Sequence, residues 1–277
     1  MNPDSAGAQA EHRSPEHRPL HQVALQIGAL ARRSVNRTLR QPAQLVPSLV
    51  FPLILMAINS AGLGKATEIP GFPTDSYLTF ALAIPFIQAG IFSVSNAGSD
   101  LARDIETGFL DRLALTPMTG LSLVSGQLAG VLVLGVIQGV IYLVVGLVAG
   151  ADFEAGLAGV PVLLALALAT SFAFGCIGIF AALRLGNSEA VQGLFPVLFV
   201  FLFLSSMALP RDLIEQDWFQ TVATYNPVSY LIEGIRSLFI DGFDGQALAL
   251  GFGFSLAIGL AFLAAASATL RTRLTRT

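Results

Sequence analysis

The chain has 277 residues, of which 54% are hydrophobic and 12% are charged, and its mean hydropathy is +0.71. Average soluble domains carry about 25% charged residues, so the composition excludes an ordinary soluble protein and indicates a membrane protein. The net charge of −3 decides little, because the position of the charges sets the orientation of a membrane protein. The single cysteine, Cys176, lies in an apolar run and is expected to be a packing residue, not a disulfide or a metal ligand.

The first forty residues are polar and then amphipathic. Residues 1–20 predict a disordered cytoplasmic tail, and in such a tail the histidines at 12 and 17, with the next at 21, favour no metal site. Residues 21–41 predict an amphipathic helix with Arg32, Arg33, Arg37 and Arg40 clustered on one side. A basic amphipathic helix directly before a membrane span is typical of a helix that lies flat in the lipid headgroup layer.

Six apolar segments follow, each close to the roughly 20 residues that a helix needs to cross a bilayer. Prolines within them predict bends rather than breaks, because neighbouring groups can satisfy the freed carbonyls. Gly135, Gly139 and Gly146 share one face of the third segment, a spacing that favours close helix packing or reflects only the high glycine content of membrane helices. The predicted spans are 43–61, 77–99, 128–149, 157–183, 190–209 and 247–270.

The basic residues predict the orientation of these spans. If the N-terminus is cytoplasmic, 12 of the 15 basic residues lie on the cytoplasmic side. Only Lys65, Arg211 and Arg236 remain on the outer side. The positive-inside rule therefore predicts that both termini and the segment between the second and third spans are cytoplasmic.

That segment, DLARDIETGFLDRLALTPMTG at 100–120, is a long charge-rich stretch between two predicted spans. Leu101, Ile105, Phe109 and Leu113 recur every four residues, so on a helix they form one apolar stripe with most charges elsewhere. We predict a short amphipathic helix over 100–118 at the membrane surface, on which a soluble partner acts.

The outer segment 210–245 also carries helix signals. Trp218 among several charges suggests an interfacial helix. Asn226 followed by Pro227 is a helix start, and Glu233 and Arg236 have the spacing to pair on one helical face. The remainder is too apolar for a solvated loop, so we predict a half-membrane or interfacial helix buried against the bundle.

Several kinds of chemistry are absent from the sequence. No ionisable residue falls in the middle of a predicted span, which argues against an ion-coupled transporter and an intramembrane hydrolase. No repeated polar face suggests a channel. The phosphate-loop pattern fails at Asn59 and Ala66, so any ATP hydrolysis must come from another polypeptide. Neutral polar side chains inside the spans predict interhelical hydrogen bonds, or alternatively a substrate path, at Gln88, Asn96, Gln138 and Gln192.

The stretch 106–117 contains Glu-x-Gly and then Leu-x-x-Leu-x-x-Thr-Pro, and it resembles the type-two permeases of ATP-binding-cassette transporters. The later Asn226-Pro227 and Glu-Gly-Ile-Arg residues at 233–236 are similar to the outer re-entrant helices of these permeases. The resemblance covers residues 21–277 and is nearest to the daunorubicin-resistance exporters. It implies that the following residues contact the ATPase: Arg103, Asp104, Glu106, Gly108, Leu110, Arg112, Leu113, Thr116 and Pro117.

The resemblance further implies an all-α membrane protein of six spans that serves as the permease subunit of an exporter in the bacterial plasma membrane. It implies a hydrophobic or amphiphilic substrate such as a drug, antibiotic or lipid, with a lipid-linked glycan or another envelope precursor as the alternative. The expected partners are two nucleotide-binding subunits, which would supply ATP and Mg²⁺, a second permease and the lipid bilayer, but no nucleic acid. We expect no catalytic residue, cofactor or metal of its own. A membrane scaffold is another class, and it would tolerate charge reversal within 100–120.

Overall fold

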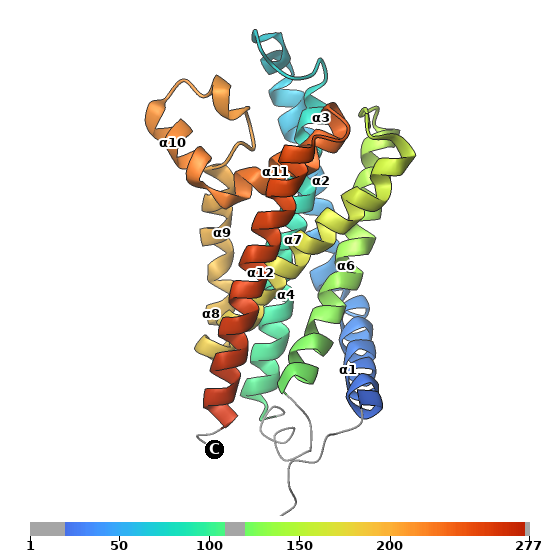
Figure 1. Cartoon of the computed structure of the whole chain (residues 1–277), viewed down its shortest axis with the longest axis vertical. Helices are drawn as coiled ribbons and strands as arrows, with labels where there is room; N and C mark the ends of the chain where they lie inside the picture. The colour runs from blue at the N-terminus through green and yellow to red at the C-terminus, as the bar shows by residue number, and fades with distance from the viewer. Residues whose placement is uncertain (1–19, 109–119, 275–277) are drawn as a thin grey trace, which may run out of the picture.

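The computed structural model describes residues 20–108 and 120–274, and every element in these two ranges is a helix. The long helices run side by side along the longest axis of the molecule (Figure 1). In chain order the elements are α1 (Leu20–Leu39), α2 (Pro42–Gly62), η1 (Gly64–Glu68), α3 (Tyr77–Ala81), α4 (Ala83–Glu106), α6 (Gly120–Val148), α7 (Gly156–Leu185), α8 (Ser188–Gln192), α9 (Leu194–Phe203), η2 (Arg211–Leu213), α10 (Asp217–Tyr225), α11 (Pro227–Ile240) and α12 (Gly245–Leu274).

Within the described ranges, 5 helical segments are long and apolar enough to cross a membrane, and they agree with five of the six predicted spans. The sixth predicted span, 190–209, is divided between α8 and α9. The apolar helical stretch there, Ser188–Phe203, is shorter than the five spans. A helix of that length extends about 24 Å, less than the roughly 30 Å of bilayer hydrocarbon. The five spans are Leu45–Gly62, Tyr77–Glu106, Val124–Val148, Gly156–Leu185 and Gly245–Leu270.

Prolines interrupt two of the predicted spans without ending them. The helix breaks at Leu82, before Pro85, and at Gly193, before Pro196. Because proline has no N–H group, the carbonyl four residues before each proline loses its helical donor. Leu82 and Gly193 keep right-handed helical backbone angles, so a new helix begins at the next residue, whereas the sequence predicted bends without breaks. Helix α2 contains two prolines and remains one uninterrupted helix.

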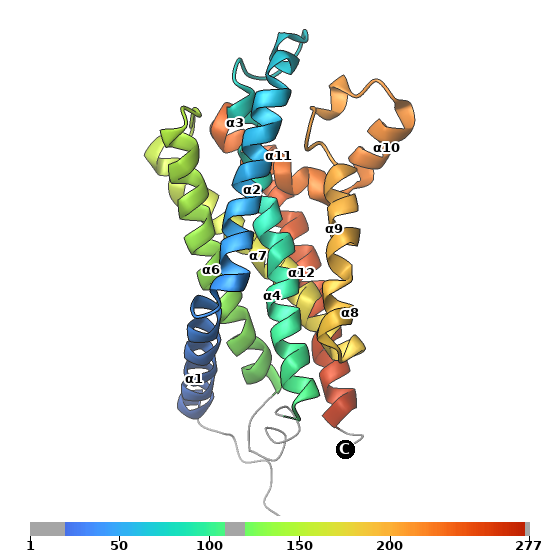
Figure 2. The same ribbon diagram turned by 180° about the vertical axis from the view of Figure 1, so that it is seen from behind.

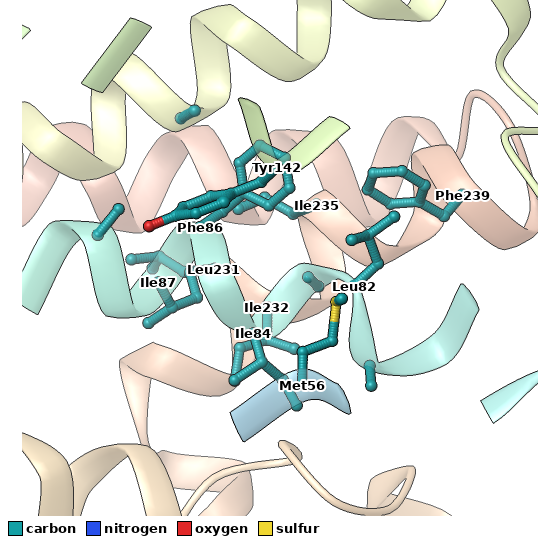
Figure 3. Packing of buried hydrophobic residues seen from close by; sticks show 14 of the residues in the cluster. Met56, Leu82, Ile84, Phe86, Ile87, Tyr142, Leu231, Ile232, Ile235 and Phe239 are labelled. Atoms are coloured by element: carbon teal, nitrogen blue, oxygen red, sulfur yellow. The ribbon is translucent and has the colours of Figure 1, made fainter. Parts of the chain in front are cut away.

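The main hydrophobic core joins helices that are distant in the sequence. Figure 3 shows Met56 of α2, Phe86 of α4, Tyr142 of α6 and Phe239 of α11 among its members. The rings of Phe86 and Tyr142 meet edge to face with centroids 5.7 Å apart, and Phe239 lies 6.2 Å from Phe86. Helix α11 has 14 residues, too few for a span, yet it buries most of its side chains in this core. It is therefore a short helix buried against the bundle, as the sequence predicted.

Helix α1 differs from its prediction. It packs against α6 and stands along the long axis of the bundle (Figures 1 and 2), whereas a helix in the headgroup layer would lie across that axis. The Ser34 hydroxyl donates a hydrogen bond to the Gln127 carbonyl of α6 at 3.4 Å. Two basic side chains of α1, Arg33 and Arg37, pair with acidic residues of α4, as described below, which favours the upright position over one among lipid headgroups.

Small residues allow the central helices to approach closely. Side chains of α7 meet α6 at Gly135 and Gly139, while Leu82 fills the space beside Gly146. This packing bears out the first interpretation of the glycine spacing in the third span. The closest crossing joins α4 and α7, where a Cβ atom at Gly98 would collide with the Gly178 carbonyl, and one at Gly178 would collide with backbone atoms of Val94.

The substitution Gly178→Ala is expected to destabilise the bundle by about 1–3 kcal/mol, because its methyl group would overlap a rigid backbone carbonyl. The matched control is Gly253→Ala on α12, where no neighbouring atom lies within 4 Å of the place that the added methyl group would take. The measurement is the thermal unfolding midpoint of each variant in detergent. Equal midpoints for the two variants would show that this contact does not limit how closely α4 and α7 approach each other.

Candidate functional site

A groove of about 360 Å³ lies between α2, α4 and the α8–α9 segment. Polar side chains from one face of α4 form its floor, and Phe92 and Phe195 contribute aromatic rings. We call this the α2–α4–α9 groove. Its lining residues are Ala43, Pro47, Phe92, Ser95, Asn96, Ser99, Arg103, Gln192 and Phe195.

An aromatic cluster adjoins the groove and connects its three walls. Phe92 of α4 lies 5.0 Å from Phe195 of α9 and 6.2 Å from Phe51 of α2, measured between ring centroids. Phe199 completes the cluster at 4.7 Å from Phe195 and 6.0 Å from Phe51. Arg103 lies near the end of α4, and Phe92 lies three turns earlier. The groove is therefore polar near the end of α4 and aromatic about three turns before that end.

The structure brings two of the four predicted path residues to this groove. Asn96 and Gln192 line it. Gln138 instead donates a hydrogen bond to the Ser48 carbonyl of α2 at 3.1 Å, which is the interhelical role that the sequence analysis also predicted. Gln88 is fully buried, and neither of its amide atoms has a hydrogen-bond partner within the described residues.

Prolines explain why backbone carbonyls need partners in this region. Pro52 cannot donate to the Ser48 carbonyl, and that carbonyl accepts hydrogen bonds from Gln138 and from the Tyr142 hydroxyl, the latter at 2.7 Å. Pro47 likewise cannot donate to the carbonyl of Ala43 in the groove wall. Tertiary contacts thus replace helical hydrogen bonds, as membrane helices with internal prolines require.

Buried charges gather where α4 ends. Asp104 accepts hydrogen bonds from Arg33 at 3.0 Å, from Arg37 at 3.2 Å and from the Gln127 amide at 3.3 Å. Arg37 also pairs with Asp100, with Nη2 and Oδ1 3.1 Å apart. Each carboxylate is only 7% exposed. A buried carboxylate requires paired charges and hydrogen bonds, so these contacts hold α1, α4 and α6 together. We call the four ionic residues the α1–α4 charge cluster.

The sequence analysis assigned Asp104 to contact with a partner and did not predict this cluster. The signal was present, because Arg33 and Arg37 are four residues apart, as are Asp100 and Asp104. Two basic and two acidic side chains with the same helical spacing can pair across two packed helices. The sequence does not show which helices become neighbours.

The charge-rich segment begins inside α4 instead of forming a separate helix from residue 100. Helix α4 continues to Glu106, and Gly108 adopts a φ of 63°, in the left-handed region that glycine tolerates best and that commonly ends a helix. Leu101 is buried in the bundle, so it is unavailable to a soluble partner. This burial corrects the expected apolar docking stripe at that residue.

The other residues of the permease-like motif are divided between two situations. Arg103 is exposed and lines the groove, while Glu106 accepts a hydrogen bond from the backbone N–H of Ser188, at the start of α8, at 2.8 Å. The end of α4 is therefore joined to α8 as well as to α1. The remaining motif residues lie outside the described residues: Leu110, Arg112, Leu113, Thr116 and Pro117.

At the opposite end of the bundle, Arg236 of α11 is only 6% exposed. It donates to the Phe80 carbonyl at 3.1 Å and to the carbonyls of Ser206 and Met207 at 3.0 and 3.2 Å, and its guanidinium lies 3.5 Å from the Phe80 ring centroid. Burial lowers the pKa of Arg236 to about 10, against the opposing effect of nearby Glu233, so the side chain stays cationic at neutral pH. Arg236 joins α3, α11 and the irregular segment after α9.

The structure confirms Asn226 as the cap of α11 and Pro227 as its first residue. The Asn226 side chain accepts a hydrogen bond from the Val228 N–H at 3.0 Å. Its amide also donates to the carbonyls of Phe201 and Leu204 at the end of α9, at 2.6 and 3.0 Å. This second function, closing the end of α9, required the tertiary structure.

The pairing expected within α11 is replaced by a different one. Glu233 pairs with Arg211 at 2.6 Å, and Arg211 also lies 4.6 Å from the centroid of the Tyr230 ring. Arg236 is directed toward backbone carbonyls, so the predicted Glu233–Arg236 ion pair is wrong. Arg211, Glu233 and Arg236 line a cavity of about 420 Å³ at this end of the bundle.

Replacing Arg236 by leucine is expected to destabilise the end of the bundle around α11 strongly, because three buried carbonyls would lose a donor at about 1–3 kcal/mol each. Lysine keeps the charge but not the planar fork, so Arg236→Lys should recover only part of the loss. The measurement is the unfolding midpoint, with the yield of monodisperse protein. Arg211→Leu is the control, since Arg211 is partly exposed and its ion pair contributes about 1 kcal/mol or less. Equal losses at both positions would contradict the special role of Arg236.

A family comparison agrees with this helical membrane architecture. The model of the ABC-2 type transporter family matches residues 25–240, which is well over half of the chain. The protein therefore belongs to the ABC-2 type transporter family. The match includes both the segment after α4 and the helices α10 and α11.

Three individual relatives share between 24% and 29% sequence identity with this chain. The chain is 28% identical to the daunorubicin resistance ABC transporter permease protein DrrB1 of Streptomyces coeruleorubidus, over 71% of this chain and 69% of the relative. It is 29% identical to the putative transport permease ycf38 of Pyropia yezoensis, over 79% and 75%. It is also 24% identical to the probable doxorubicin resistance permease DrrC of Mycobacterium tuberculosis H37Rv, over 76% and 75%.

These findings define the chain as the permease component of an ABC transporter and as a multi-pass membrane protein. Members of this kind carry no ATPase domain and work with an ATP-binding subunit. Among residues 20–108 and 120–274, no group of three histidine, cysteine or acidic side chains is placed to hold a metal ion.

Proposed function

We propose that this permease moves a hydrophobic or amphiphilic compound, such as a drug, antibiotic or lipid, out of the cell across the plasma membrane. The observation that carries the proposal is the α2–α4–α9 groove, which places polar groups and aromatic rings along one wall. The names of two relatives refer to daunorubicin and doxorubicin resistance, which supports a drug as substrate.

The groove suits an amphiphile because its two parts offer different interactions. A polar group of the substrate would reach Asn96, Ser99 and Arg103, and a ring system or acyl chain would pack on Phe92 and Phe195. Aromatic side chains give a large contact area with planar ligands at little cost in conformational entropy.

The proposed topology has six crossings with both termini in the cytoplasm. The start of α1, the ends of α4 and α12 and the start of α6 lie at the same end of the bundle (Figure 1). From that end, α8 and α9 lead beside α4 toward α10 (Figure 2). They form the sixth crossing together with the irregular residues that follow α9. The charge distribution of the sequence supports this orientation.

The full transporter would contain two permease chains, identical or different, and two ATP-binding subunits. Segment 100–118 would contact the ATPase, since α4 ends and α6 begins at the proposed cytoplasmic end. ATP and Mg²⁺ would bind the partner subunit. A displacement of the segment would then act directly on α4, which contributes most of the groove lining.

Affinity purification of the tagged chain from its own membranes should recover an ATP-binding subunit in mild detergent. Arg112→Glu should abolish substrate-stimulated ATP turnover while the chain remains folded, because charge reversal opposes the proposed contact. Thermal stability is the control for folding. Recovery of no ATPase under several mild detergents, or unchanged turnover in the variant, would contradict the coupling role.

In proteoliposomes containing the complete complex, Phe92→Ala and Asn96→Leu should lower daunorubicin transport several-fold, because each removes one type of contact from the groove. Val197→Ala is the matched control on α9, since Val197 is 51% exposed and does not line the groove. The measurement is ATP-dependent uptake of daunorubicin into these proteoliposomes. No daunorubicin uptake, with uptake of a lipid-linked oligosaccharide instead, would favour the glycan alternative.

A further inference from the structure

The α1–α4 charge cluster connects α1 to α4 and, through Gln127, to α6. Asp104 receives three hydrogen bonds, from Arg33 and Arg37 of α1 and from Gln127 of α6. Separating α1 from this site would leave two nearly buried carboxylates, Asp100 and Asp104, without their cations. Breaking a buried ion pair by removing one partner is strongly destabilising, so α1 and the adjoining ends of α4 and α6 are expected to move as one body.

Helix α1 leads directly into a wall of the groove. It ends at Leu39, and α2 begins at Pro42 after a short break. The span in α2 lies mostly at the surface of the chain, with 17% of its residues buried compared with 83% for the span in α3 and α4. A helix with few buried contacts is easier to displace than the densely packed span opposite it.

We propose that α1 is a lever that transmits movement of the cytoplasmic end of α4 to α2, and that Arg37 is the positioning residue that couples the two. Arg37 contacts both Asp100 and Asp104, so it bridges successive turns of α4. The segment after α4 would displace the end of α4, the α1–α4 charge cluster would carry α1 with it, and α2 would shift relative to α9. The proposal rests on the proposed role of the groove as the substrate path.

The first test measures distances in the complex reconstituted with its ATPase in nanodiscs, on a Cys176→Ala background. Spin labels are attached through Asn36→Cys on α1 with either Val133→Cys on α6 or Val197→Cys on α9; all three positions are exposed. Trapping with ADP and vanadate should leave the 36–133 distance unchanged and shift the 36–197 distance. A change in the 36–133 distance on trapping, or no change in the 36–197 distance, would overturn the lever.

The second test compares variants by the amount of substrate transported per ATP hydrolysed. Arg37→Gln should lower this ratio several-fold and broaden the 36–133 distance distribution, and Arg37→Lys should recover part of both. Arg32→Gln is the matched control, since Arg32 is an exposed arginine on the same helix without an ion pair among the described residues. If Arg37→Gln folds poorly, Arg37→Gln combined with Asp100→Asn removes both charges and should fold while remaining uncoupled.

A folded variant lacking Arg37 that keeps the wild-type ratio and the wild-type 36–133 distribution would overturn the proposal. The distances also separate this failure from failure of the proposed function. If no ATPase associates with the wild-type chain, the proposed function fails, and with it the lever's role in transport. If the ATPase associates and drives transport while α1 moves independently of α6, only the lever is overturned.

Discussion

The need to satisfy buried polar groups within the protein organises both ends of this bundle. The hydrocarbon core of a bilayer offers no hydrogen bonds. Each buried charge, and each carbonyl freed by proline or by an irregular turn, therefore needs a partner in the chain. Arg236 supplies donors at one end, where an irregular segment follows α9. Asp104 collects donors from α1 and α6 at the other end. These two residues set which helices meet there.

Between the two ends, the packing of small and apolar residues holds the helices together. Gly98 and Gly178 bring the backbones of α4 and α7 together, and the main core joins α2, α4, α6 and α11 around Phe86. Against this compact centre, α2 and α9 remain loosely attached at the edge. The groove lies where the dense and loose parts of the bundle meet, a location that allows its width to change without disruption of the core.

Much of the fold followed from the sequence because hydropathy and segment length are local properties. Five spans, the Asn226 cap and the short buried α11 were all predictable on that basis. The interval 190–209 was less regular than predicted, because Gly193 and Pro196 divide it and the helix ends at Phe203. Proximity of Asn96 and Gln192 could not be predicted, since it depends on which helices become neighbours.

By itself the sequence determined a polytopic helical membrane protein, its resemblance to type-two permeases, and the need for an ATPase from another polypeptide. The tertiary structure decided the partners of the charges. Arg37 pairs with α4 instead of lipid headgroups, Glu233 pairs with Arg211 instead of Arg236, and Leu101 is buried instead of exposed. The physical reason is the same in each case. Helical periodicity places a side chain on a face of its own helix, but only the packing of helices decides what that face meets.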